Sequence, residues 1–197
     1  MSGQSVADFV LGSDPVLDAA EILLNTAGNE KAEIVNGEVI PMSPTGEDPI
    51  YAEGEIFVSL RSYAKLKKLP GRVVPDNAGF LVNLPLRKSF SPDVAYYEGP
   101  RHGMKFFRGA PLFAVEVRSE GDYGPAAERA MAEKLADYFA AGTLVVWDVD
   151  LLSEDVVRVH RADAPETPAI YRRGQTAEAE PAVPGWTMPV DDLFDAR

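Results

Sequence analysis

The sequence predicts an α/β domain in which a mixed central β-sheet is flanked by helices. Short runs of β-prone apolar residues, separated by Gly and Pro, predict strands at 72–75, 79–84, 92–97, 112–118, 144–149 and 156–160. Apolar residues at helical spacing instead predict helices at 50–69 and 125–141. Because the second helix connects two strands, it predicts a βαβ crossover and one parallel strand pair. The other strands are joined by turns, so the sheet is expected to be mixed.

The N-terminal part of the chain predicts an arm, a helix and a β-hairpin in that order. Residues 1–14 are expected to form the arm and 15–26 a short helix. The pair Asn36-Gly37 stands between two β-prone runs within 32–40. Asn and Gly tolerate the positive φ angles of a type I′ turn, so this segment predicts a tight hairpin.

Prolines and glycines set the ends of the two longer helices. Residues 41–49 are expected to be a loop that leads into the helix at 50–69. Pro70 ends that helix, because proline has no backbone N–H and disfavours helical geometry in the residue before it. The helix at 125–141 is expected to end before Gly142, since glycine commonly follows the last helical turn.

The composition is that of one globular domain, expected to span residues 15–197. The chain has 197 residues, of which 46% are hydrophobic, enough for a sizeable core. No run of about 18 apolar residues occurs, and the first residues lack the basic and apolar segments of a secretory signal. We therefore expect a cytoplasmic protein without membrane contact. The stretch 177–184, biased toward Ala, Glu and Pro, predicts a loop.

The types of metal ligand in the sequence are restricted. The absence of cysteine excludes disulfides and thiolate metal sites. His102 and His160 are the only imidazoles, too few for a typical structural zinc site, and both predict loop or surface positions. A metal site in this chain is therefore expected to use oxygen ligands.

The net charge of −12 argues against broad electrostatic attraction to DNA, but the segment 61–72 is basic. It contains five basic residues and no acidic one: Arg61, Lys65, Lys67, Lys68 and Arg72. This patch could bind phosphate groups. Basic runs of this kind are also common on the solvated faces of helices, so both interpretations stay open.

Two carboxylates stand within apolar strands. Asp93 follows Pro92 in the strand at 92–97, and Glu116 lies within the strand at 112–118. Burying a lone carboxylate is unfavourable by several kcal/mol unless a cation, hydrogen bonds or a proton compensates. Two such acids on neighbouring strands would form a hard-oxygen site suited to Mg²⁺ or Mn²⁺. The alternative for each acid is an ion pair with a nearby Arg or Lys.

Lys134 interrupts the apolar stripe of the helix at 125–141. At about 100° per residue it shares one face with Ala127, Ala130, Met131, Tyr138 and Ala141. Its stem could pack in the core while its ammonium reaches water. Alternatively, Lys134 reaches over the sheet toward Glu116, where it would neutralise the site or act on substrate.

Several motifs, in one order along the chain, carry a resemblance to a known family. They are Glu33 to Val39 with Met42-Ser43-Pro44, Pro92-Asp93-Val94, Val115 to Ser119, Lys134 with Tyr138, Val146-Trp147 and Pro184-Gly185-Trp186. With this set the chain resembles the PD-(D/E)XK restriction-endonuclease-like superfamily. Within it, the chain is similar to a bacterial family of small proteins named for restriction endonucleases and largely of unknown function. The resemblance covers residues 15–195.

The resemblance implies a restriction-endonuclease-like fold and Mg²⁺- or Mn²⁺-dependent cleavage of DNA. Asp93 and Glu116 would be the metal ligands, joined by the carbonyl of Val117. The superfamily's lysine falls where this chain has Arg118, which stays protonated and could only stabilise an oxyanion. Lys134 matches the place on the helix to which the family's lysine has moved. It is therefore the predicted positioning or proton-transfer group.

Glu53 stands where the family often has a histidine, and either Glu53 or Glu55 could face the metal as a third carboxylate. The implied partners are DNA and a second copy of the chain in a homodimer, with no membrane. Two hypotheses follow: a divalent-metal-dependent DNA endonuclease, and a catalytically weak or inactive module that uses the same fold to bind nucleic acid or protein. The acidic charge and Arg118 favour the second, whereas the paired acids and the helix lysine favour the first.

Overall fold

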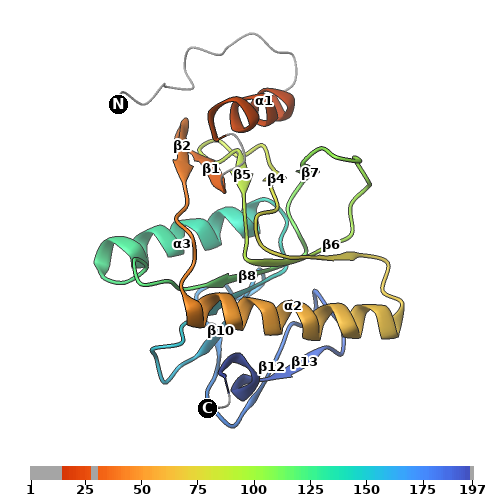
Figure 1. Ribbon diagram of the computed structural model, residues 1–197, viewed down its shortest axis with the longest axis vertical. Helices are drawn as coiled ribbons and strands as arrows, with labels where there is room; N and C mark the ends of the chain where they lie inside the picture. Colours follow the sequence, from red (N-terminus) through yellow and green to blue (C-terminus); the bar gives the residue numbers. More distant parts are fainter. Residues whose placement is uncertain (1–14, 28–30, 196–197) are drawn as a thin grey trace.

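The computed structural model describes residues 15–27 and 31–195 (Figure 1). A central β-sheet has one long helix on each face, and a smaller lobe at the top of the view contains α1 (Pro15–Ala27), a hairpin and three short strands. The predicted arm at 1–14 lies outside the described residues. Within the described ranges, no helix is long and apolar enough to cross a membrane.

Six strands form the central sheet. In spatial order they are β11 (Ala169–Tyr171), β10 (Val157–Arg161), β9 (Val145–Val149), β8 (Phe113–Val117), β6 (Val94–Tyr97) and β3 (Arg72–Val74). Within this sheet β8 and β9 pair in parallel, and every other neighbouring pair is antiparallel. The predicted mixed sheet and its parallel pair across the helical crossover are confirmed.

Helices α2 (Glu47–Lys67) and α3 (Pro125–Ala140) cover opposite faces of this sheet. Strand β8 shows how both faces come to be covered, because successive side chains of a strand point to opposite faces of the sheet. Val115 packs in the core under α2, and Ala114 packs in the core under α3. Glu116 has the same parity as Ala114, so the strand directs its side chain toward α3.

The N-terminal hairpin consists of β1 (Ala32–Val35) and β2 (Glu38–Pro41). Asn36 and Gly37 connect the strands with φ angles of 52° and 77°. Two successive positive φ angles define the type I′ turn that the sequence predicts. Helix α1 packs against this hairpin through a small apolar core of its own.

The remaining strands are short and flank the central sheet. Three of them form a small sheet: β4 (Phe80–Leu81), β5 (Ser89–Phe90) and β7 (Phe107–Arg108). Near the C-terminus follow β12 (Thr176–Glu178), β13 (Thr187–Pro189) and the 3₁₀ helix η2 (Val190–Leu193). Trp186 stacks on Trp147 with ring centroids 4.9 Å apart, which attaches this C-terminal segment to the core under α2.

Three expectations about local structure differ from the fold. Helix α2 begins at Glu47, inside the segment 41–49 that was expected to be a loop, because Pro49 is compatible with the first turn of a helix. The strand expected over 79–84 is confined to β4, and the loop expected over 177–184 begins within β12. Strands of two or three residues contain too little periodicity to be recognised in a sequence.

Candidate functional site

Asp93 is fixed at the start of β6 by the neighbouring strand β8. Its backbone N–H donates to the Val115 carbonyl at 3.0 Å, and its Oδ2 accepts the Val117 N–H at 2.7 Å. These bonds extend the β6–β8 pairing beyond Val94, the first paired residue of the ladder. The side chain is buried in this position, and its Oδ1 is left for other partners.

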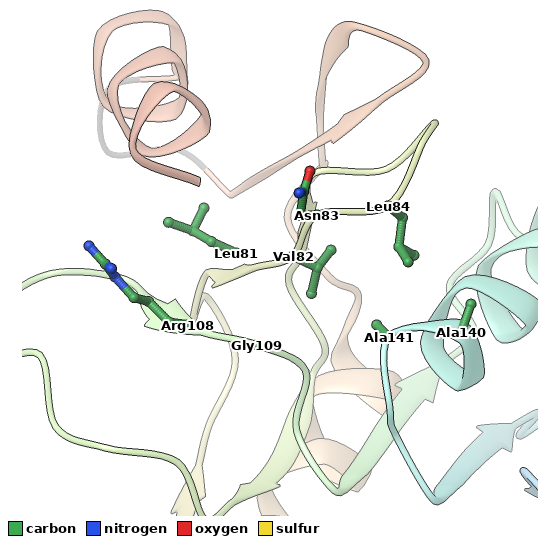
Figure 2. Close-up of a pocket in the computed structure, with 8 residues that line it drawn as sticks. All are labelled: Leu81, Val82, Asn83, Leu84, Arg108, Gly109, Ala140 and Ala141. Carbon is green, nitrogen blue, oxygen red and sulfur yellow. The ribbon is translucent and has the colours of Figure 1, made fainter. Parts of the chain in front are cut away.

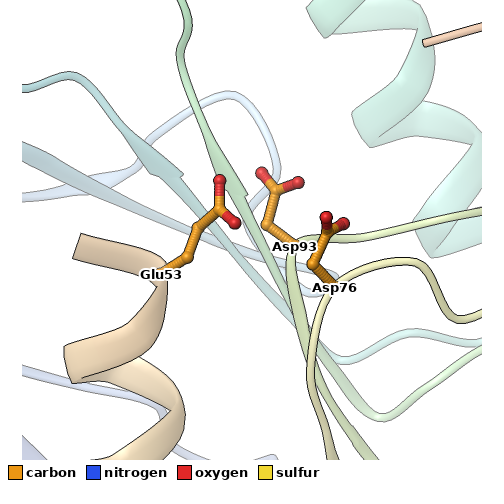
Figure 3. Close-up of side chains that lie close together, drawn as sticks. All are labelled: Glu53, Asp76 and Asp93. Carbon is orange, nitrogen blue, oxygen red and sulfur yellow. The ribbon is translucent and has the colours of Figure 1, made fainter. Parts of the chain in front are cut away.

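Three carboxylates meet at this end of the sheet and form what we call the acidic cluster: Glu53, Asp76 and Asp93 (Figure 3). Each offers one oxygen, and these oxygens all lie within 4.8 Å of one another. Glu53 projects from α2, Asp76 from the connection after β3, and Asp93 from the residue before β6. Three segments of the chain thus contribute one carboxylate each, and the group could hold a metal ion.

Glu53 is the most unusual member of the acidic cluster. It is 3% exposed, and neither of its carboxylate oxygens has a hydrogen-bond partner in the described part of the chain. Burial raises the pKa of its carboxyl to about 8, and the negative charges of Asp93 and Asp76 add to this effect. A buried carboxylate without partners favours a proton or a cation, so Glu53 fits a hard metal ion.

Lys31 supplies positive charge to the acidic cluster. Its Nζ lies 2.6 Å from Asp93 Oδ1 and 2.6 Å from Asp76 Oδ1. Burial alone would lower the pKa of this ammonium, but the charges of Asp93 and Asp76 raise it above its ordinary value. Lys31 therefore stays protonated and offsets part of the negative charge of these two acids, whereas Glu53 has no ion pair among the described residues.

Glu116 lies within electrostatic reach of the acidic cluster, and both of its oxygens are engaged. Lys134 Nζ is 2.7 Å from Oε2, and Tyr138 donates its hydroxyl to Oε1 at 2.6 Å. Lys134 is 9% exposed, so it reaches over the sheet to Glu116 rather than out to water. Burial alone would lower the pKa of Lys134, but Glu116 and Glu33 raise it, and its ammonium stays charged.

Glu33 holds Lys134 from the side of the hairpin. Its Oε1 lies 3.0 Å from Lys134 Nζ and accepts the Ser91 N–H at 2.9 Å, while its Oε2 pairs with Arg87 at 2.5 Å. Burial alone would raise the pKa of Glu33, but Lys134 and Arg87 lower it. The ionised carboxylate therefore bridges two cations and fixes Lys134 in place.

The structure does not bring Arg118 to the acidic cluster. Its guanidinium donates to both oxygens of Asp148 at 2.8 Å and also pairs with Glu128 on α3. The side chain is buried, and these contacts tie β8 to β9 and to α3. A catalytic role for Arg118 stays a prediction, and this arrangement does not favour it.

Comparison with known proteins places these features in a family. A family model described as "Uma2: Putative restriction endonuclease" matches residues 19–191. The chain belongs to the Uma2 family. The family expected from the sequence motifs is thereby confirmed. A comparison with curated proteins gives no match.

A solved structure similar to this Uma2 chain supports the fold. It is the crystal structure of "a putative nuclease belonging to DUF820" from Anabaena variabilis ATCC 29413. The two structures align with a TM-score of 0.65 at 17% sequence identity, over 83% of this chain and 89% of that chain. At this identity the likeness shows a shared fold, and the predicted fold class is confirmed.

Three residues at the site of this Uma2 protein were not candidates in the sequence: Lys31, Glu33 and Asp76. One of them could have been recognised in the sequence: Asp76 follows a proline after β3, just as Asp93 follows a proline before β6. No local pattern distinguishes Lys31 or Glu33 from the exposed charges of an ordinary hairpin. Their partners lie far along the chain and become neighbours only in the fold.

Of the two acids expected as a third carboxylate, Glu53 lies in the acidic cluster and Glu55 does not. Two residues along α2 correspond to a rotation of about 200°, so the two side chains leave the helix in nearly opposite directions. Glu55 is half-buried, and its charge acts instead on Tyr51.

The residues of the predicted basic patch do not share one surface in the structure. Four of its residues are exposed on the later turns of α2 and its C-cap: Arg61, Lys65, Lys67 and Lys68. Arg72, on β3, instead donates to the carbonyl oxygens of Gly99 and Pro100 and lies over the ring of Tyr97. Arg72 is thus used within the fold, whereas the residues on α2 face outward.

A hollow of about 360 Å³ lies between the end of α3 and the small three-stranded sheet (Figure 2). Its wall is formed by Leu81, Val82, Asn83, Leu84, Arg108, Gly109, Ala140 and Ala141. These residues include no carboxylate and none of the acidic cluster, so the hollow offers no ligand set for a hard cation. The candidate functional site is therefore the acidic cluster.

Proposed function

We propose that this protein is a divalent-metal-dependent nuclease that hydrolyses phosphodiester bonds of DNA. The observation that carries the proposal is Glu53, a buried carboxylate with no hydrogen-bond partner among the described residues, next to Asp76 and Asp93. Mg²⁺ and Mn²⁺ are hard cations that prefer oxygen ligands of this kind. Membership of the Uma2 family supports the same class of reaction.

In this proposal Asp93, Asp76 and Glu53 hold the ion, and the carbonyl of Val117 is a further candidate ligand. The bound ion would lower the pKa of its water and stabilise charge on the attacked phosphate. The Val117 N–H positions Asp93 by fixing Oδ2. Lys31 now occupies the oxygens of Asp93 and Asp76, so its ammonium has to move aside when the acids take up a divalent ion.

Lys134 acts as a fixed positive charge rather than as a general base. Its raised pKa means that it cannot accept a proton near neutral pH. Glu116, Glu33 and the surrounding core hold the ammonium in one place, which suits the stabilisation of negative charge on a phosphate. Glu116 orients Lys134 and adds negative charge beside the acidic cluster.

A catalytically inactive binding module is the second candidate, and Lys31 favours it. Its ammonium already pairs with both Asp76 and Asp93, so these two acids have partial compensation without a metal. The net charge of −12 also disfavours DNA, except through a local basic surface such as that on α2. Metal binding separates the candidates, because a binding module has no need of an ion.

Calorimetric titration with Mn²⁺ tests the metal site in wild type, Asp93→Asn and Glu53→Gln. We expect the wild type to bind the ion and each variant to bind it about tenfold or more weakly, since each loses a charged ligand. Glu55→Gln is the matched control, because it makes the same change on the same helix outside the acidic cluster. Failure of the wild type to bind Mn²⁺, or equal binding by all four proteins, would contradict the site.

Incubation with plasmid and single-stranded DNA at low salt tests the reaction. We expect slow cleavage that is faster with Mn²⁺ than with Mg²⁺ and falls steeply with salt. Asp93→Asn and Glu116→Ala should lose it, and Glu55→Gln should keep it. Equal cleavage by the wild type and Asp93→Asn would reveal a contaminating nuclease. Metal binding without cleavage of either DNA would refute the proposed activity while leaving the metal site intact.

A further inference from the structure

The Lys and Arg side chains that have no acidic partner are concentrated in two segments of the chain. The chain has 31 acidic and 19 basic residues. Most of its described Lys and Arg side chains form an ion pair or a hydrogen bond. Within the described ranges, those that form neither lie in 61–68 and 101–108, with Arg129 as the one exception. These cations are therefore available to a negatively charged partner.

The fold brings these two segments together through Arg72, at the start of β3. Its guanidinium donates to the carbonyl oxygens of Gly99 and Pro100 at 2.8 and 3.0 Å. The same guanidinium lies over the rings of Tyr97 and Phe107. The C-terminal end of α2, which leads into β3, is therefore held beside the connection between β6 and β7. Figure 1 shows this end of α2 and that connection on the same side of the molecule.

Five exposed cations at this junction form what we call the basic surface: Lys65, Lys67, Lys68, Arg101 and Lys105. The first three lie at the end of α2 and its C-cap, and the other two lie in the β6–β7 connection. Within 61–75 and 97–110 the only carboxylate is that of Glu98, which accepts the Tyr96 hydroxyl at 2.8 Å. On a chain of net charge −12, the basic surface is thus a local concentration of positive charge that attracts phosphate groups.

The acidic cluster is accessible from the same edge of the central sheet. Strand β3 is the last strand of that sheet, with Arg72 at its start and Asp76 two residues after its end. The side chain of Asp76 is 30% exposed, compared with 8% for Asp93, so an ion in the cluster would be reached from the β3 side. Extended chain between Arg72 and Asp76 spans at most about 14 Å. The basic surface and the acidic cluster therefore lie about four base-pair steps apart along one edge.

We propose that the basic surface binds the phosphate backbone of duplex DNA and directs the strand along β3 to the acidic cluster. The inference rests on the proposed nuclease function and gives its substrate a path, in which Arg101 and Lys105 contact phosphates. Cleavage then requires the duplex to extend about four base pairs beyond the attacked phosphate, toward the basic surface. DNA is favoured over an anionic membrane because the path ends at a site proposed to act on phosphodiesters.

Fluorescence anisotropy with a short labelled duplex in EDTA measures DNA binding by the full chain without cleavage. We expect the wild type to bind at low salt, and the double variant Arg101→Ala/Lys105→Ala to bind about tenfold or more weakly. The slope of log affinity against log salt concentration should fall in magnitude by about two, because two phosphate contacts are lost. Lys65→Ala/Lys68→Ala should have a similar effect, because both segments belong to one surface.

Arg129→Ala is the matched control, because Arg129 is an exposed arginine without an ion pair on α3, which covers the other face of the sheet. It should change neither the affinity nor the slope, and circular dichroism checks that all variants fold. A wild type that does not bind DNA at low salt, or an equal loss of affinity in Arg129→Ala, would overturn the proposal. Double variants that keep their affinity for DNA but lose binding to phosphatidylserine vesicles would overturn it in favour of a membrane.

The same measurements separate the basic surface from the proposed reaction. DNA binding in EDTA that depends on both segments, without cleavage in any metal, would support the basic surface and refute the reaction. Cleavage that is equally fast in the wild type and in Arg101→Ala/Lys105→Ala would support the reaction and overturn the basic surface. Where the wild type cleaves an end-labelled duplex, cleavage should stop about four base pairs short of the same end, 5′ or 3′, of each strand. Cleavage up to both ends would refute the path along β3.

Discussion

Replacing Glu53 by Gln should stabilise the metal-free protein at alkaline pH and leave its stability unchanged in acid. Burial and the charges of Asp93 and Asp76 raise the pKa of Glu53 from 4.5 to about 8. Between these values the native protein holds a proton that the unfolded chain has lost. The corresponding stability is fully present below pH 4.5 and is lost as the pH rises through about 8. Glutamine does not titrate, so the variant avoids this loss.

The magnitude follows from the width of that window. Each pH unit changes the free energy of unfolding by about 1.4 kcal/mol for one proton. From 4.5 to about 8 the window spans about 3.5 units, which sets an upper bound of about 5 kcal/mol. Relaxation and water entry weaken the effect of burial in real proteins. We therefore expect Glu53→Gln to exceed the wild type by about 2 kcal/mol above pH 8 and to match it near pH 4.5.

Urea unfolding in EDTA across this pH range measures the difference. Glu55→Gln is the control, since it removes a carboxylate from the same helix outside the acidic cluster and should give a difference that does not change with pH. A Glu53→Gln difference that stays constant with pH would refute the inference that Glu53 is desolvated among other acids. The same pH dependence in Glu55→Gln would also refute this inference. Added Mn²⁺ should stabilise the wild type far more than Glu53→Gln.

Three further predictions concern residues around the site. Lys31→Met removes the ammonium shared by two acids of the cluster, so the Mn²⁺ affinity measured by calorimetry should rise about tenfold; an unchanged affinity would show that Lys31 does not compete with the ion. Lys134→Met leaves Glu116 buried without its cation and should lower the free energy of unfolding in urea by about 3–5 kcal/mol; a near-neutral change would indicate that the ammonium reaches water. Gly37→Ala should destabilise the hairpin by about 1–2 kcal/mol in the same assay, because its φ is positive; no change would count against the type I′ turn.

Local patterns were sufficient to predict most of the fold. Turn chemistry at Asn36-Gly37 and the apolar periodicity of α2 and α3 depend on neighbours within a few residues, which is the range a single sequence displays. Asp93 and Glu116 were recognisable for a related reason, because a charge in an apolar strand needs compensation. Lys134 stood out in the same way on an apolar helix face.

The residues that pair with these buried charges could not be predicted from local patterns. Lys31 contacts Asp93 across 62 positions of the chain, and Glu33 accepts a hydrogen bond from Ser91 across 58. Both contacts depend on how the N-terminal hairpin meets the end of the central sheet. Arg118 shows the same limit, because Asp148, 30 positions away, engages a guanidinium that local sequence associates with the acidic site.

The charges around the acidic cluster do not balance, because carboxylates outnumber the cations that pair with them. Five carboxylates meet there: Glu33, Glu53, Asp76, Asp93 and Glu116. Three cations pair with them: Lys31, Arg87 and Lys134. Five minus three leaves two negative charges, and Arg87 is in addition shared with Asp137 at 2.8 Å, so at least two negative charges stay uncompensated where burial makes them unfavourable. The raised pKa of Glu53 expresses this excess, because a proton on its carboxyl removes one of these charges.

A divalent ion should therefore replace the proton on Glu53. If Mn²⁺ binds at the acidic cluster near pH 7, we expect about one proton to be released per chain, because a ligand must be ionised to bind the metal. Calorimetric titrations in buffers of different ionisation enthalpy measure this number directly. Glu53→Gln has no proton to lose at this position and should release about one proton fewer than the wild type, whereas Glu55→Gln should behave like the wild type; any proton still released would come from Glu116, whose pKa burial raises to about 7. Binding by the wild type without proton release would mean that Glu53 is already ionised, and that the buried excess of charge is compensated in another way.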